Sequence, residues 1–365
     1  PVTVKNIGDV ASKEVVQVYA KAPYTKGGVE KSAIQLAGFT KTDVINPGES
    51  VTVNVECDLQ YIASYDSSAN GGKGSYILDA GRYEFAVGNG AHDALNNILA
   101  KEGKGVNDGM DYEGKSALAK SWDYNGKESE IFQTSKCGGE VKNRLELADW
   151  NNYPGVTEKV TYLSRSDWKG TWPKEYTGLR PSDEMAYYLN GDFHDPEKAD
   201  KNVSDILWDQ KNGLTIADMV GSDFDDERWE KLISQMSLDE CFLLSFNGGR
   251  GYNSAESVGF IGASNGFTEN GPFGLYSYID GTGSIAPWAI EKLGETDEER
   301  FYCAVYPNPV VIASSFNLDL IHEEGRLIGN DALFTNIYIL WGPGMNTHRT
   351  PYSGRNVEYY SEDPL

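Results

Sequence analysis

The first hundred residues carry short runs in which hydrophobic and polar residues alternate, with turn residues between the runs. Alternation places successive side chains on opposite faces of an extended chain, so it predicts β-strands. The predicted strands are Val2–Lys5, Glu14–Ala20, Ile34–Thr40, Val51–Cys57, Ser75–Leu78 and Tyr83–Val87. We therefore predict an all-β antiparallel sandwich over residues 1–98. Its buried side chains are expected to include Val15, Val18, Leu36 and Phe39.

Residues 99–210 are polar, with glycines and charges interleaved and no periodic hydrophobic pattern. Large indole rings nevertheless need a surface on which to pack, so the segment is not simply disordered. These rings belong to Trp122, Trp150, Trp168 and Trp172. We predict a polar linker or insertion over residues 99–210 that lies against its neighbours.

Beyond residue 211 the hydrophobic period changes to that of helices. Asp226–Met236 has its apolar residues on one helical face. Ser237–Glu240 has the spacing of a capping box, in which the serine accepts from a backbone N–H and the glutamate bonds back, so it predicts the start of another helix. Leu318–Phe334 is amphipathic, and Asn317 is placed to cap it.

The run Ile337–Trp341 is apolar throughout and is followed by Gly342-Pro343-Gly344. An uninterrupted apolar run is typical of a parallel strand covered by helices on both faces. A helix, a buried strand and a glycine-rich loop follow one another in α/β (TIM-type) barrels, whose active sites lie on the loops after the strands. We predict that residues 211–365 form the incomplete N-terminal part of a (β/α)8-type barrel.

The composition excludes several classes of partner. The 365 residues include 32 Lys+Arg and 55 Asp+Glu, giving a formal net charge of −23, which disfavours binding to nucleic acid or to an anionic membrane. No apolar run approaches the ~20 residues of a membrane span. The histidines lack metal-ligand spacing, and the cysteines are scattered without a C-x-x-C pair, which fits a reducing compartment. The cysteines are Cys57, Cys137, Cys241 and Cys303.

One motif matches a known pattern without its context. Gly109–Ser116 satisfies G-x-x-x-x-G-K-[ST], the pattern of a phosphate-binding loop. The preceding Lys101–Asp108 does not read as a buried strand, and Asp111 and Glu113 would place carboxylates beside phosphate oxygens. We therefore reject a nucleotide site here.

The densest group of hydrogen-bonding side chains follows the predicted strand. Gly342–Pro364 holds two Arg, one His, two Asn and several carboxylates. Such groups suit a polyhydroxyl ligand, because each sugar hydroxyl both donates and accepts and the planar guanidinium can span two of them. The alternative is a structural ion pair of Arg355 with Glu358 or Asp363, and the residues alone leave both open.

The same stretch, Gly342–Pro364, resembles the G-P-x-x-N-I-H-R-x-P-x-G-G-R-N-x-E-x-Y-S-E-D-P motif of glycoside hydrolase family 3. Other motifs of that family's barrel are similar to Tyr306–Asn317, Glu324–Gly329 and Asn270–Leu275. The fibronectin type III-like domain of the same enzymes resembles Gly27–Ser32, Leu36–Phe39, Pro47–Ser50 and Val87–Gly90. Here that domain precedes the barrel, as in β-glucosidases of anaerobic gut and rumen bacteria with rearranged domain order.

The resemblance implies a retaining β-glucosidase that hydrolyses terminal β-D-glucosyl residues of short β-glucosides without a cofactor. It implies that no catalytic residue lies in this segment, because the family's nucleophile and acid/base carboxylates match nothing in residues 1–365. We read the chain as an internal fragment, since strand-like alternation begins at Pro1 and no closing element precedes Leu365. The expected partners are a β-glucoside or oligosaccharide and the remainder of the same polypeptide. A homo-oligomer is left open, and a bacterial, cytoplasmic location is expected.

Carried over by position, the resemblance makes Arg355 the residue that binds sugar hydroxyls in the −1 subsite, with its guanidinium turned inward. His348, Arg349 and Glu358 match the surrounding frame and are expected to orient Arg355 and its loop. Asn270 stands where the family has an Asp that holds hydroxyls, and an amide loses the strength of a charged hydrogen bond. That departure keeps a second function open, a non-catalytic carbohydrate-binding or adhesion protein. Glu269 is an alternative source of the missing carboxylate, and Tyr276 stands where an Arg often follows.

Overall fold

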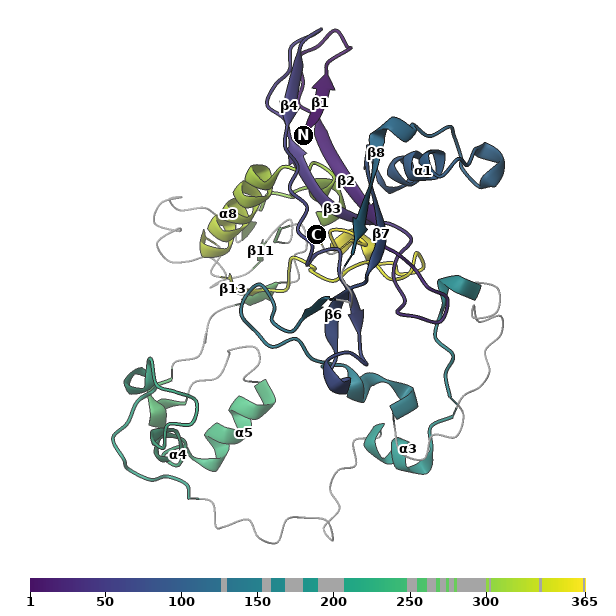
Figure 1. Ribbon diagram of the computed structural model, residues 1–365. Coiled ribbons are helices and arrows are strands. Elements are labelled where there is room, and N and C mark those ends of the chain that lie inside the picture. Colours follow the sequence, from purple (N-terminus) through teal and green to yellow (C-terminus); the bar gives the residue numbers. More distant parts are fainter. Residues whose placement is uncertain are drawn as a thin grey trace. The chain divides into compact units, whose positions relative to one another are not determined.

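The structure is a computed structural model. It describes residues 1–125, 130–152, 159–167, 180–189, 207–247, 255–260, 267–269, 274–275, 279–280, 300–301, 303–334, 337–363 and 365. The chain divides into two compact units, Pro1–Lys198 with Leu365, and Ala199–Pro364 (Figure 1). Within the described ranges, every helix is too short or too polar to span a bilayer.

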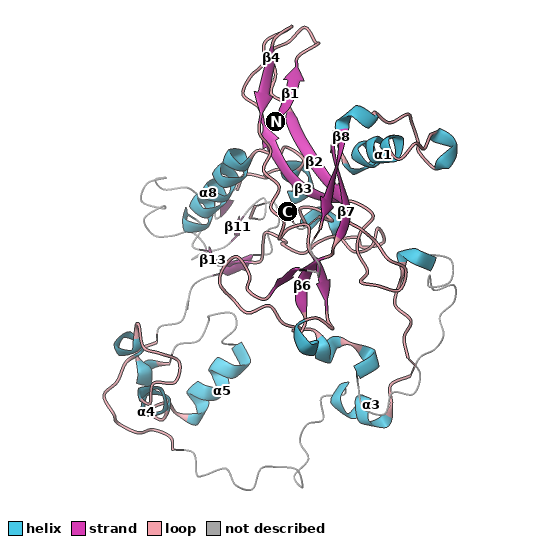
Figure 2. Ribbon diagram, viewed as in Figure 1, coloured by secondary structure: helices cyan, strands magenta, loops and turns pink. Residues whose placement is uncertain are grey.

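The first unit is built on antiparallel β-sheets (Figure 2). A four-stranded sheet has the order β3-β2-β7-β8, formed by β2 (Val15–Lys21), β3 (Gln35–Lys41), β7 (Gly81–Gly88) and β8 (Ala119–Tyr124). A three-stranded sheet pairs β6 (Ser75–Leu78) with β5 (Ser64–Asp66) and β9 (Glu130–Phe132). A separate two-stranded ribbon pairs β1 (Val2–Lys5) with β4 (Ser50–Val53).

The core of this unit forms where alternating side chains meet. Ala20, Ala37, Ile62, Leu78 and Tyr83 make one buried cluster. Among the side chains predicted to be buried, Val18 and Leu36 are, whereas Val15 and Phe39 are half-buried. The predicted strands match the observed ones closely, except that β4 is shorter than expected and β5 was not predicted.

Strands β8 and β9 lie in the segment for which we predicted a linker without a core pattern, so the structure differs there. Trp122 and Tyr124 of β8 pack on the buried cluster, and their ring centroids lie 5.4 Å apart. Trp122 also lies 5.4 Å from the ring of Tyr83, which belongs to β7. Strand pairing thus gives the indole the packing surface it needs. The sheet therefore extends beyond the boundary expected at residue 98.

Helix α1 (Ala91–Lys101) packs against β7 through buried Ala94 and Ile98. The rejected phosphate-loop motif lies beside this helix, where Asn96 Nδ2 donates to Asp111 Oδ1 at 2.6 Å. A 3₁₀ turn, η2 (Val106–Asp108), precedes the motif in place of the strand that a phosphate loop requires. The structure thus agrees with the rejection.

Residues 159–167 also contact the sandwich. Ser164 Oγ and the Arg165 backbone N–H donate to the Glu30 carboxylate at 2.6 and 3.2 Å. The Arg165 guanidinium lies 4.2 Å from the centroid of the Tyr24 ring, in a cation–π contact. These bonds, the Ser164 hydroxyl first, lower the pKa of Glu30. Ser164 and Arg165 are thus held against Glu30 and Tyr24.

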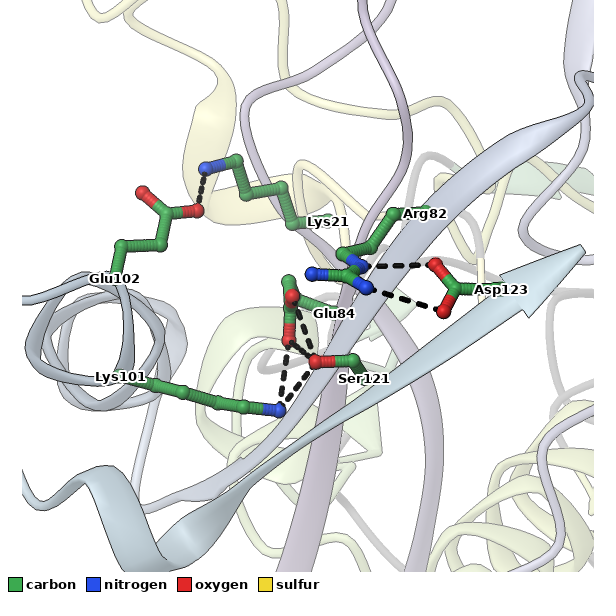
Figure 3. Close-up of polar contacts among 7 residues, drawn as sticks. All are labelled: Lys21, Arg82, Glu84, Lys101, Glu102, Ser121 and Asp123. Atoms are coloured by element: carbon green, nitrogen blue, oxygen red, sulfur yellow. Dashed lines mark hydrogen bonds and ion pairs between the residues drawn. The ribbon is translucent and has the colours of Figure 1, made fainter.

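A polar network joins the end of α1 to the sheet (Figure 3). The Glu84 side chain of β7 is buried and accepts from Ser121 Oγ at 2.9 Å and from Lys101 Nζ at 3.2 Å. Lys21 pairs with Glu102 beside it. Because a buried carboxylate loses its hydration on folding, these donors offset the desolvation cost.

Replacing Lys101 with alanine is expected to lower the free energy of unfolding by about 1–3 kcal/mol, because Glu84 would lose its only charged donor in this network. Urea denaturation of the chain measures the change. The exposed Lys120 is the matched control, and its replacement should change stability by less than about 0.5 kcal/mol. Equal effects of the two replacements would show that the network adds nothing to stability.

The second unit begins with short helices. Helices α4 (Arg228–Ile233) and α5 (Leu238–Asn247) follow the predicted periodicity, although α4 is shorter than expected. The predicted capping box is present: Glu240 N donates to Ser237 Oγ at 3.1 Å, and Ser237 N donates to Glu240 Oε2 at 2.9 Å. A local core contains Met219, Leu232, Met236, Ala255 and Val258.

The remaining elements of this unit precede the segment Gly342–Pro364, which is rich in hydrogen-bonding side chains. Helix α7 (Pro309–Ala313) precedes α8 (Leu318–Phe334), whose bounds and Asn317 cap are as predicted, with Leu320 N donating to Asn317 Oδ1 at 3.2 Å. Strand β13 (Ile337–Leu340) pairs in parallel with β10 (Phe267–Glu269). The strands β11 (Ile279–Asp280) and β12 (Arg300–Phe301) form a separate antiparallel pair. One further helix, α3 (Asp183–Leu189), belongs to the first unit and lies within residues 99–210.

Strands β10 and β13 pair in parallel, which is the arrangement expected for neighbouring strands of an α/β barrel. Ile337 is buried with Leu275 and Cys303, and Ala332 of α8 packs against this cluster. A helix therefore covers one strand of the pair, as in α/β proteins. Trp341 lies beyond the strand and is 55% exposed, so the predicted strand was one residue too long. The closed barrel stays a prediction.

Candidate functional site

The candidate site is the loop that leaves β13, residues 342–363, named here the site loop. Its two arms run side by side: Gly344 forms a parallel bridge with Tyr359, and His348 N donates to Ser361 O at 2.9 Å. A Cβ atom on Gly344 would lie well inside van der Waals distance of the Glu358 carbonyl oxygen and the Tyr359 ring. The closeness of the arms therefore requires glycine at position 344.

His348 ties the same two arms together through its side chain. Its Nε2 lies 3.1 Å from the Tyr359 carbonyl oxygen, and its ring centroid lies 6.3 Å from that of Tyr359. A carbonyl oxygen only accepts, so Nε2 carries the proton in this contact. The imidazole is thus engaged with the backbone of the site loop.

A compact turn connects the two arms of the site loop. Ser353 N donates to Thr350 O at 3.3 Å, and Asn356 Nδ2 donates to the same oxygen at 2.8 Å. The 3₁₀ turn η10 (Asn356–Glu358) follows directly, and α7 packs against it. Arg355 therefore stands on a segment whose backbone is fixed on both sides.

The guanidinium of Arg355 forms a bidentate pair with Glu358. Arg355 Nε donates to Glu358 Oε1 at 2.7 Å, and Arg355 Nη2 donates to Glu358 Oε2. This hydrogen bonding, with the carboxylate charge, raises the pKa of Arg355. The structural ion pair that we left open for Arg355 is therefore present.

The predicted inward orientation of Arg355 is not seen, because its side chain is 60% exposed. The pair with Glu358 nevertheless occupies two of the five guanidinium N–H donors. Three N–H groups remain without a bond to the described residues. The ion pair therefore fixes the side chain without using up its capacity to bind hydroxyls.

The other predicted site residues are placed to different extents. Arg349 is exposed on the site loop. Asn270 and Tyr276 lie outside the described residues, as does the side chain of Glu269. The backbone of Glu269 pairs with Leu340, so the strand that precedes residue 270 ends beside the strand that precedes the site loop. In α/β proteins the binding loops follow the carboxyl ends of the parallel strands.

Sequence reasoning missed a titratable group near the site loop. Tyr306 OH donates to Asp331 Oδ2 of α8 at 3.0 Å. Burial, followed by the bond with Asp331, raises the pKa of Tyr306 to about 12. Burial also raises the pKa of Glu324. The pKa of Tyr360 is raised as well, first by burial of its phenol and then by the charge of Glu324. The seven-residue spacing of Glu324 and Asp331, two turns of one helical face, is the signal that could have linked them.

The raised pKa of Tyr306 predicts a change of stability at high pH. The neutral phenol is favoured in the folded state, so its contribution is complete below the unfolded value of about 10 and is lost as pH rises towards 12. We expect Tyr306→Phe to lose less thermal stability than the unmodified chain between about pH 10 and 12. Replacement of the exposed Tyr352 by Phe is the control, and parallel curves for all three proteins would contradict the prediction.

Known proteins resemble this chain in sequence. A sequence model of the fibronectin type III-like domain matches residues 14–91. The chain is 28% identical to beta-glucosidase A of Butyrivibrio fibrisolvens, in an alignment that covers 100% of the chain and 38% of that protein. It is also 28% identical to a beta-glucosidase of Ruminococcus albus, with 99% and 32% covered. The chain is a homologue of β-glucosidases.

Solved structures agree with this homology. The crystal structure of a β-glucosidase from Paenibacillus barengoltzii matches 99% of the chain and 34% of its own length, with a TM-score of 0.51 and 21% identity. The likeness shows a shared fold. The resemblance to glycoside hydrolase family 3 and its fibronectin type III-like domain is thus confirmed. The chain spans 38% of the length of the Butyrivibrio fibrisolvens protein and 32% of the length of the Ruminococcus albus protein.

Proposed function

We propose that the polypeptide carrying these 365 residues is a glycoside hydrolase that releases terminal β-D-glucosyl residues from short β-glucosides. The observation that carries this proposal is the similarity to two β-glucosidases along the whole chain. The net charge of −23 disfavours anionic ligands and leaves the binding of a neutral sugar unaffected, so it is compatible with an uncharged glucoside as substrate.

The site loop supplies part of the −1 sugar subsite in this proposal. Arg355 binds hydroxyls of the terminal glucose with the N–H groups that Glu358 leaves available. Glu358 fixes the plane of the guanidinium, His348 holds the two arms of the loop together, and Arg349 lies beside them. Asn270, the residue that follows β10 in the sequence, is assigned to the same subsite in this proposal, because β10 ends beside β13.

The fold of the second unit is proposed to be the first part of a TIM-type barrel. The parallel pair β10–β13 and the covering helix α8 support this arrangement. The reaction is proposed to retain anomeric configuration, through a carboxylate nucleophile and an acid/base carboxyl about 5 Å apart. Both carboxylates are expected outside residues 1–365, so residues 1–365 alone should not hydrolyse a glucoside.

A second candidate is a non-catalytic carbohydrate-binding protein on the same scaffold. The observation that favours it is Asn270, which stands where the resemblance places an Asp. An amide still donates and accepts hydrogen bonds, so it would bind a sugar even where it weakens the reaction.

The test is an assay of the whole polypeptide on a panel of p-nitrophenyl α- and β-glycosides. We expect turnover of the β-glucoside and none of the α-glucoside, with the first-formed glucose in the β-configuration by NMR. Absence of turnover on every β-glycoside would refute the hydrolase. If glucose or cellobiose still bound, that result would favour the second candidate.

A further inference from the structure

Tyr306 contacts two other segments of the second unit. Its hydroxyl donates to Asp331 Oδ2 of α8 at 3.0 Å. Its ring lies against Gly274, where an added Cβ would stand 2.7 Å from Tyr306 Cδ2 and 3.2 Å from the Ala304 carbonyl oxygen. Gly274 also has a φ of +104°, so both its backbone and its surroundings require glycine. A single side chain therefore ties α8 to the chain at Gly274.

The Tyr306–Asp331 bond lies next to an apolar cluster that reaches the parallel strands. Leu275, which follows Gly274, is buried with Cys303 and Ile337, the first residue of β13. Ala332, which follows Asp331, packs against the same cluster. Because close-packed side chains transmit strain, a change in this bond would be felt at the start of β13.

Helix α8 leads directly into the site loop. It ends at Phe334, β13 begins at Ile337, and the loop leaves that strand at residue 342. Glu324 lies seven residues before Asp331, on the same face of α8. Burial, and then the charge of Glu324, raise the pKa of Tyr360 on the second arm of the site loop. One face of α8 thus acts both on Tyr306 and on the far arm of the loop.

We propose that Tyr306 and Asp331 are positioning residues for Arg355: their hydrogen bond fixes α8 and, through β13 and the site loop, sets where the guanidinium stands against the sugar. The proposal rests on the function proposed above, and it assigns neither residue a contact with substrate. Glu358 fixes the plane of the guanidinium, and the Tyr306–Asp331 bond fixes the loop that carries it. A misplacement of about 1 Å can cost about 100-fold in rate, so a bond remote from the chemistry can control it.

The test is a double-mutant cycle with the whole polypeptide, measured as kcat/KM on p-nitrophenyl β-glucoside. Tyr306→Phe keeps the ring against Gly274 and removes only the hydroxyl, so it should lower kcat/KM about tenfold. In the Arg355→Ala background the same change should lower it less than about twofold, because the group that the bond positions is already absent. A general weakening of the fold would lower kcat/KM equally in both backgrounds.

The partner residue offers a rescue, and the first unit offers a control. Asp331→Asn keeps an oxygen that accepts from the phenol, so it should retain kcat/KM within about threefold, whereas Asp331→Ala should match Tyr306→Phe. Tyr83→Phe is the control, because it removes a phenol hydrogen bond of the same length, 3.0 Å to the Asp79 carbonyl oxygen, in the first unit. It should lower the melting temperature and leave the kinetics unchanged.

Each outcome decides between the two proposals. A loss of equal size in both backgrounds, or kinetics that Tyr306→Phe leaves unchanged, would refute the positioning role alone. Loss of cooperative melting in Tyr306→Phe would also refute it, because the hydroxyl would then serve the fold. Absence of turnover by the unaltered polypeptide on every β-glycoside would refute the proposed function itself, and the positioning role with it.

Discussion

Replacing Arg355 with alanine is expected to lower kcat/KM of the whole polypeptide on β-glucosides by about 10- to 100-fold. The loss arises because hydrogen bonds from a charged donor to sugar hydroxyls strengthen as the transition state forms. Steady-state kinetics on p-nitrophenyl β-glucoside would measure it. Arg355→Lys should recover only part of the activity, since an ammonium cannot both pair bidentately with Glu358 and span two hydroxyls.

Arg326 provides a matched control for this replacement. It forms the same kind of fork, with Nε donating to Glu323 Oε2 at 2.8 Å and Nη2 to Glu323 Oε1 at 2.5 Å, on the exposed side of α8. Both arginines are largely exposed and pair with a glutamate three residues away, so Arg326→Ala removes the same kind of fork outside the site loop. Glu358 is 18% exposed and Glu323 48%, so Arg355→Ala should cost somewhat more stability, and melting temperatures of both variants are compared beside the kinetics. Equal kinetic effects of Arg326→Ala and Arg355→Ala would show that the ion pair, and no sugar contact, explains the role of Arg355.

The second large effect is expected from Gly344→Ala. The added Cβ would collide with the Glu358 carbonyl oxygen and the Tyr359 ring, so the two arms of the site loop would have to separate. We expect a loss of about 1–3 kcal/mol in unfolding free energy, as overpacking in close contacts costs. Separated arms would also move Arg355, so affinity for glucose should fall with stability.

Gly354 is the control for this change, because an added Cβ there would meet nothing within 4 Å. Thermal denaturation and sugar binding of Gly344→Ala and Gly354→Ala can be compared directly. Gly354→Ala should retain both properties. If Gly344→Ala also retained both, the arms of the site loop would be shown not to touch as closely as described.

Local signals in the sequence predicted the local structure well. The Ser237–Glu240 capping box and the Asn317 cap depend on residues three positions apart, so the residues that make each bond lie within one window of sequence. The bounds of α8 follow from its amphipathic period for the same reason. The alternating strands of the first unit were likewise predicted within a few residues.

The pairing of strands that are far apart in the sequence could not be predicted from such local patterns. Trp122 stands in a polar stretch, and the Tyr83 ring on which it packs belongs to a distant strand. Nothing in the residues around β8 indicates that it pairs with β7, so the local composition suggested a linker. The same limit applies to β10 and β13, whose adjacency is a property of the sheet.

The candidate site shows both cases. The density of hydrogen-bonding side chains indicated the site loop, and an ion pair of Arg355 with Glu358 or Asp363 was the alternative that the residues left open; the structure has the pair with Glu358. The orientation of the guanidinium was not predictable, since exposure depends on every element that surrounds a side chain. The Tyr306–Asp331 bond likewise joins residues whose proximity arises only when α8 packs.

The most direct test of the central claim is a crystal structure of the whole polypeptide with glucose bound. The account predicts a glucose hydroxyl within about 3 Å of an Arg355 guanidinium nitrogen, with Glu358 still paired to that guanidinium on its other side. It would be contradicted by glucose bound at a site from which the loop of residues 342–363 is absent.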